Sequence, residues 1–119
     1  MFVRWKRRNT NPKRTRGWPG RAEHSLYAVL VRSDRVDGKP RQRVVRYLAH
    51  IGEQYTGATA HQQYFWERVD AQLDDLGLDD AIRQPVTSSL IEVVPRPTSQ
   101  ELAQLKRDQE RLARAPLPR

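Results

Sequence analysis

The chain has 119 residues, of which 37% are hydrophobic and 30% charged, and none is cysteine. This length predicts one domain with a small core, and the lack of cysteine excludes disulfides and thiolate metal sites. The charge is uneven, because residues 1–50 hold 14 Lys and Arg against 3 Asp and Glu, whereas residues 51–119 hold 8 against 11. Such a basic half is typical of proteins that contact a polyanion, and phosphate backbones are the commonest polyanions.

The sequence gives no sign of a secretory signal or of a membrane span. The basic N-terminus is not followed by the apolar run of a secretory signal. The longest apolar stretch, Tyr27 to Val31, is far too short to cross a membrane. We therefore expect a soluble, cytoplasmic protein.

The first predicted element is a strand over residues 2–8, whose alternation turns Val3 and Trp5 inward. Residues 9–24 collect Asn, Pro, Gly and basic side chains, which predicts a long basic loop. Residues 25–33 give the clearest strand signal, with the apolar pattern on both faces that suits a central strand.

A hairpin should follow, because Asp37-Gly38 supplies two residues that tolerate positive φ between two strand-like runs. The return strand covers residues 41–50. Strict alternation places its residues on two faces, one with Arg41, Arg43, Val45 and Tyr47, the other with Gln42, Val44, Arg46 and Leu48.

The second half predicts three helices. The first runs from about residue 60 to residue 76, with Thr59 as its N-terminal cap and Gly77 as its C-terminal cap. The second begins at Asp79-Asp80, and Pro85 predicts either a kink or a restart within it.

The third predicted helix opens with the capping box Thr98-Ser99-Gln100-Glu101 and extends to about Ala113. Its apolar face consists only of Leu102, Leu105 and Leu112, so it should pack weakly or wait for another chain. A Pro-containing tail, residues 115–119, completes the sequence.

The predicted fold class is α+β, with a three-stranded antiparallel sheet packed against two to three C-terminal helices. Residues 1–50 form the basic β-sheet region and residues 51–119 the helical region of one compact domain. The second helix completes the core. The predicted core contacts join Val3, Trp5, Leu26, Ala28, Leu30, Val44 and Leu48 of the sheet to Phe65, Val69 and Leu73 of the first helix.

Four segments of the first half resemble a known pattern. They are the opening Met1-Phe2-Val3-Arg4, the strand at residues 26–31, the turn Asp37-Gly38-Lys39 with Arg41-Gln42-Arg43, and Tyr47-Leu48. The first 50 residues resemble the N-terminal segment of bacterial insertion-sequence transposases of the DDE type. Those transposases carry several hundred further residues with an RNase-H-like catalytic core. Residues 51–119 contain no counterpart of that core. The resemblance therefore implies association with mobile-element DNA but no strand transfer.

A second resemblance concerns the turn Val94-Pro95-Arg96-Pro97-Thr98. It is similar to a turn that precedes the last helix of small uncharacterised bacterial proteins. It implies no activity.

The basic hairpin is the main candidate site. A two-stranded ribbon fits the major groove of B-DNA, where arginine grips guanine or bridges phosphates. The alternative is that the hairpin is a solvated sheet edge, whose charges prevent its strands from aggregating with those of other molecules. The candidate residues are Arg32, Arg35, Lys39, Arg41, Arg43 and Arg46.

The N-terminal strand and loop form a second basic group, which could order on phosphates or serve only to solubilise the chain. Four aromatic residues interleave with the basic ones and could stack on unpaired bases, which would favour single strands or RNA: Trp5, Trp18, Tyr27 and Tyr47. In a small sheet, Trp5 and either Tyr27 or Tyr47 are more often core residues, so Trp18, between Gly17 and Pro19, is the candidate we keep for stacking. The basic candidates are Arg4, Lys6, Arg7, Arg8, Lys13, Arg14 and Arg16.

No catalytic or metal-binding pattern is found in the sequence. The three histidines are scattered, and the carboxylates of the helical half fit a solvated face better than a magnesium site. We expect no enzyme activity and no cofactor.

The prediction is a small nucleic-acid-binding protein, with DNA favoured over RNA and a possible link to a mobile element. The alternative is a protein-binding adaptor, inhibitor or accessory subunit of a larger nucleoprotein complex, which would use the acidic helical half. No membrane and no small-molecule substrate is expected.

Overall fold

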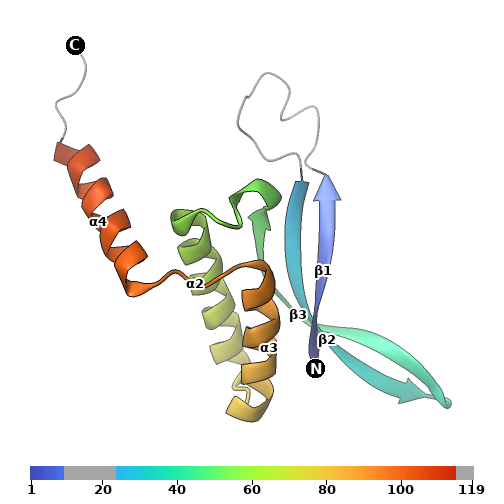
Figure 1. Cartoon of the computed structure of the whole chain (residues 1–119). Coiled ribbons are helices and arrows are strands. Elements are labelled where there is room, and N and C mark those ends of the chain that lie inside the picture. Colours follow the sequence, from blue (N-terminus) through green and yellow to red (C-terminus); the bar gives the residue numbers. More distant parts are fainter. Residues whose placement is uncertain (10–23, 115–119) are drawn as a thin grey trace.

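The structure is a computed structural model that describes residues 1–9 and 24–114. Within these ranges the strands are β1 (Phe2–Asn9), β2 (His24–Val36) and β3 (Lys39–Gly52), which form an antiparallel sheet in the order β1-β2-β3. A short 3-10 helix, η1 (Glu53–Tyr55), leads to α2 (Thr59–Leu76), α3 (Asp80–Val93) and α4 (Ser99–Arg114). The predicted α+β fold is confirmed (Figure 1).

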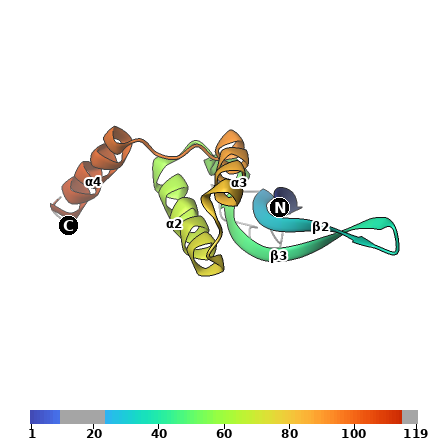
Figure 2. The same ribbon diagram turned by 90° about the horizontal axis from the view of Figure 1, so that it is seen from below.

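The turn between β2 and β3 is the predicted Asp37-Gly38 pair. Both residues have positive φ, 55° at Asp37 and 77° at Gly38. Such a turn matches the right-handed twist of the two strands, and Val36 pairs directly with Lys39 across it. The strands extend further than predicted, so the hairpin is long and projects away from the helices (Figures 1 and 2).

Two bulges in β3 overturn the strict alternation predicted for this strand. Along β2 the pairing is continuous, but Leu48 and Val45 of β3 have no partner in the register. Each extra residue shifts the facing of the strand by one position. As a result, Val45, Leu48 and Ile51 contribute to the core, whereas Val44, predicted to be buried, is 61% exposed.

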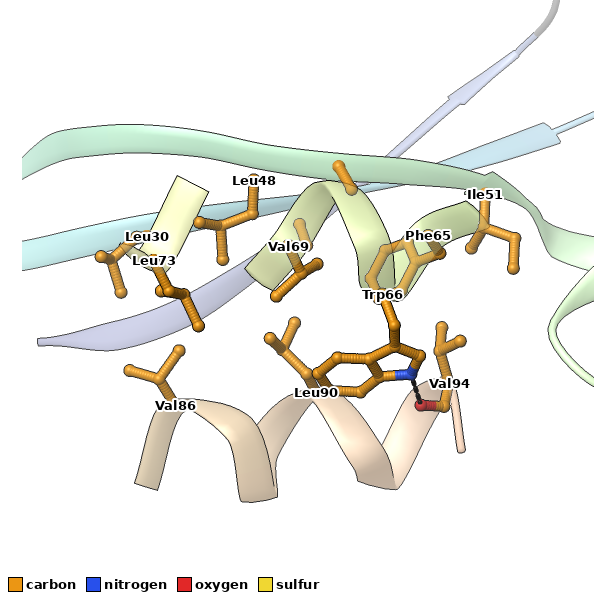
Figure 3. Close-up of a cluster of buried hydrophobic side chains, with 12 residues drawn as sticks. Leu30, Leu48, Ile51, Phe65, Trp66, Val69, Leu73, Val86, Leu90 and Val94 are labelled. Atoms are coloured by element: carbon orange, nitrogen blue, oxygen red, sulfur yellow. Dashed lines mark hydrogen bonds between the residues drawn. The ribbon is translucent and has the colours of Figure 1, made fainter. Parts of the chain in front are cut away.

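The core lies between the sheet and the pair α2 and α3 (Figure 3). Phe65 of α2 is fully buried. Its ring stacks on Trp5 with centroids 6.0 Å apart and meets Trp66 edge-on at 5.7 Å. The indole of Trp66 donates a hydrogen bond to the carbonyl oxygen of Val94 at 3.1 Å, which ties α2 to the end of α3. Apart from Val44, the predicted core residues belong to this cluster or pack against it.

Of the two caps predicted for α2, the C-terminal cap is confirmed and the N-terminal cap is wrong. Thr59 is the first helical residue rather than the cap, which is Ala58 and makes no side-chain cap bond. The Thr59 hydroxyl instead lies 3.5 Å from a carboxylate oxygen of Glu101 in α4. Gly77 ends the helix in the left-handed conformation, with φ of 62°.

Substituting Gly77 with alanine is expected to destabilise the protein by about 1 kcal/mol, because a Cβ disfavours left-handed backbone. No atom lies within 4 Å of where that Cβ would be, so the loss comes from the backbone alone. Gly57→Ala is the matched control, since its site is equally open and its φ is not positive. Chemical denaturation measures both, and equal losses for the two variants would contradict the explanation.

The later helices follow the sequence closely. The α3 helix runs through Pro85 without the restart that was one alternative. The predicted capping box of α4 is present, with the backbone nitrogen of Glu101 donating to the Thr98 hydroxyl at 3.1 Å and the Thr98 nitrogen donating to the Glu101 carboxylate at 3.3 Å. No residue of α4 is buried, and Leu112 is 76% exposed. No helix in the described ranges is long and apolar enough to cross a membrane.

Candidate functional site

The two faces of the sheet differ in what covers them. The helices α2 and α3 lie on one side, where α2 packs on β3 and α3 on β1 (Figure 2). No described helix lies over the opposite side, which we call the open face. From the register, the open face carries Phe2, Arg4, Lys6 and Arg8 of β1, Ser25, Tyr27, Val29, Val31, Ser33 and Arg35 of β2, and Pro40, Gln42, Val44, Tyr47, His50 and Gly52 of β3.

The open face has cations and, among the described residues, no carboxylate. Arg4, Lys6 and Arg8 follow one another on alternate positions of β1. The Arg4 guanidinium lies 3.4 Å from the Gln42 side-chain oxygen, and the Arg8 guanidinium lies over the Tyr27 ring at 5.2 Å. Arg7, also predicted to bind nucleic acid, faces the other way and pairs with Glu53 at 2.9 Å.

Three rings cluster on the β2 and β3 strands of the open face. Tyr27 and His50 are direct partners on β2 and β3, and their rings stack with centroids 5.2 Å apart. Tyr47 lies beside both, 5.9 Å from Tyr27 and 6.4 Å from His50, and its hydroxyl hydrogen-bonds to the Nδ1 of His50. We call Tyr27, Tyr47 and His50 the aromatic cluster.

The aromatic cluster also lies near α2. Partial burial raises the pKa of the Tyr47 hydroxyl above its usual value of 10.0, and the neighbouring Tyr27 adds to this effect. Arg68 of α2 is close enough to oppose the shift, and Tyr64 of α2 is close enough to reinforce it. The Arg68 guanidinium donates to the Tyr64 hydroxyl at 2.8 Å, so these two exposed side chains form one unit.

The raised pKa of Tyr47 predicts how stability depends on alkaline pH. Folding favours the neutral hydroxyl, so its contribution is complete below about pH 10 and is lost as the pH rises from there through the folded-state pKa. The unfolding free energy of Tyr47→Phe should therefore fall less than that of the wild type between about pH 9 and pH 11. Denaturant titrations at each pH measure the difference, and parallel curves would refute the assignment.

The outer part of the β2–β3 hairpin, residues 32–43, carries the other predicted cations, and we call it the distal hairpin. On the side opposite the open face, Asp34 pairs with Arg32 at 3.0 Å and with Arg43 at 3.9 Å. This one carboxylate therefore partly neutralises two of the predicted binding residues. The remaining cations, which have no ion pair within the described ranges, are Arg35, Lys39 and Arg41.

Arg46 does not belong to the candidate surface, although the sequence grouped it there. It lies on the helix side, the face that alternation gave it together with Leu48, and it pairs with Leu30 in the register. Its guanidinium binds Asp75 and donates to the Gln72 side-chain oxygen at 3.1 Å. Arg46 therefore joins the sheet to α2 and has little freedom to reach a ligand.

Sequence reasoning did not find the aromatic cluster as a group. It favoured the core for Trp5 and for either Tyr27 or Tyr47, but of the three only Trp5 packs against the core cluster. His50 was treated as an isolated residue. The signal lay in the pairing of Tyr27 with His50, which is visible only once the register is known. Lys13, Arg14, Arg16 and Trp18 lie outside the described residues.

Comparison of the chain with protein-family models, curated proteins and solved structures finds no match. Among residues 1–9 and 24–114, no group of three or more His, Asp or Glu side chains is arranged to hold a metal ion. The candidate site therefore rests on its own geometry, which joins exposed cations, stacked rings and an uncovered sheet face.

Proposed function

We propose that this chain is a small, non-catalytic nucleic-acid-binding protein, with DNA the favoured ligand. The observation that supports this most is the row Arg4, Lys6 and Arg8 on a face whose described residues include no carboxylate. Alternate residues of a strand are about 7 Å apart, so the row offers regularly spaced cations to a phosphate backbone. Each phosphate neutralised in this way releases a condensed counterion.

The distal hairpin is the second part of the proposed surface. Arg35, Lys39 and Arg41 lie on a two-stranded ribbon that projects from the body (Figure 1). A ribbon of this kind fits the major groove of duplex DNA. The resemblance of residues 1–50 to transposases favours DNA of a mobile element as the target.

The test is a titration of affinity against salt. Binding of a labelled 20-base-pair duplex and of a 20-nucleotide single strand should weaken steeply between about 50 and 200 mM salt, because phosphate neutralisation dominates the affinity. Fluorescence anisotropy gives the slope of log affinity against log salt. A flat dependence, or no binding at 50 mM salt, would refute the proposal.

A second candidate function follows from α4. Its sequence is amphipathic, but none of its leucines is fully buried: Leu102 and Leu105 are half-buried and Leu112 is exposed. Such a helix suits a protein partner, as an accessory subunit would require. Removing residues 99–119 should then leave nucleic-acid affinity unchanged while abolishing a protein contact that survives nuclease treatment.

A further inference from the structure

We propose that the aromatic cluster of the open face binds an unpaired base of single-stranded DNA by stacking. This inference rests on the proposed function and names the form of the ligand. It adds to the phosphate contacts of β1 a contact that duplex DNA cannot make, because paired bases keep their faces inside the helical stack.

The stack on the open face is incomplete on one side. The Arg8 guanidinium lies over the Tyr27 ring, and His50 stacks on Tyr27 from the neighbouring strand. His50 is exposed and stands on β3, which is an edge strand of the described sheet. Within the described residues its ring contacts Tyr27 and Tyr47, so a planar group arriving from the β3 edge would extend the row by one member.

Further side chains around the cluster suit a nucleotide. Tyr64 of α2 is 56% exposed and Tyr47 is 38% exposed, which leaves aromatic surface in contact with water. Arg68 binds the Tyr64 hydroxyl, and Lys6 lies directly opposite Tyr27 in the register. Rings that offer stacking surface, with cations beside them for the backbone, form the usual arrangement for single strands.

The charge of the open face selects this occupant over a protein partner. Its described residues include four cations, Arg4, Lys6, Arg8 and Arg35, and no acid. An apolar protein surface would leave these cations unpaired on contact, whereas a single strand supplies both phosphates and exposed base faces. The two requirements are met by the same ligand.

The experiment compares three probes of equal length by fluorescence anisotropy at one salt concentration: a dT20 strand, a 20-unit abasic strand with the same phosphates, and a 20-base-pair duplex. The wild type should bind dT20 more tightly than the abasic strand by about 5- to 150-fold, the range that stacking of one base supplies. A U20 strand should bind no more tightly than dT20.

Two variants assign the effect to the aromatic cluster. His50→Ala and Tyr47→Leu should remove most of the preference for dT20 over the abasic strand and leave the abasic and duplex affinities unchanged. His50→Phe, which keeps a ring, should retain the preference. His61→Ala is the matched control, because His61 is an exposed histidine stacked on Tyr55 at 4.2 Å outside the open face. Thermal unfolding by circular dichroism verifies that each variant is folded.

The possible failures are distinguishable. Equal affinity for dT20 and the abasic strand, with steep salt dependence for both, would overturn base stacking and leave the proposed function standing. Tenfold tighter binding of U20 than dT20 would overturn the assignment to DNA. A preference for dT20 that persists in both His50→Ala and Tyr47→Leu would place the stacking site elsewhere. No binding of any probe would refute the proposed function itself.

Discussion

Replacing Phe65 with alanine should destabilise the protein by about 3–5 kcal/mol, the largest loss we expect from any single substitution. The side chain is fully buried and joins the sheet to α2 through its contacts with Trp5 and Trp66. Its removal leaves a cavity where β1 and α2 meet, and a core this small has few other side chains to fill it. Domains of this kind are stabilised by only about 5–15 kcal/mol in total.

Denaturant titration followed by tryptophan fluorescence measures this loss, since Trp5 and Trp66 both flank the substituted site. Leu112→Ala is the control, because Leu112 is a large apolar residue that lies almost wholly in water. Its effect should stay within about 0.5 kcal/mol. A loss below about 1 kcal/mol for Phe65→Ala would mean that the core is not organised around this ring.

The second large effect concerns binding. The triple substitution Arg4→Gln, Lys6→Gln and Arg8→Gln should make the negative slope of log affinity against log salt shallower by about 2 to 3. The reason is that each phosphate contact contributes somewhat less than one to the magnitude of this slope. The loss should be similar for different base sequences, since phosphate contacts carry no sequence information. Anisotropy titrations of the variant over a range of salt concentrations measure the slope.

The matched control removes the same charge from another element. Lys106→Gln, Arg107→Gln and Arg111→Gln on α4 lower the net charge by three but act on a helix with no buried residue, remote from the open face (Figure 2). This variant should keep most of the wild-type slope. Equal reductions by the two triple variants would mean that net charge alone, and not the β1 row, governs binding.

Local signals in the sequence were enough to predict the order and type of the elements. Asp37-Gly38 marked the hairpin, Gly77 the end of α2 and Thr98 with Glu101 the start of α4, because each depends on backbone conformation within a few residues. The cap predicted at Thr59 was wrong by one position, since α2 begins at Thr59 itself and the Thr59 hydroxyl contacts Glu101 of α4, a residue remote in sequence.

The facing of β3 could not be predicted in the same way. Alternation assigns residues to faces only where pairing is regular. The two unpaired residues of β3 change the spacing between residues on the same face from two positions to three. Val44, Tyr47 and His50 therefore share the open face, and the positions that follow Val44 and Tyr47 turn to the core. The aromatic cluster follows from this shift, because regular alternation would place His50 on the face of Leu48, and the cluster was therefore missed.

The bulges of β3 have a second consequence, for the direction of the distal hairpin. Bulges bend a strand and increase its local twist. The bulge at Val45 is the one nearer the distal hairpin, whereas the bulge at Leu48 lies in the core. We expect the Val45 bulge to set the angle between the distal hairpin and the helices, so deleting Val45 should change the direction in which the hairpin projects.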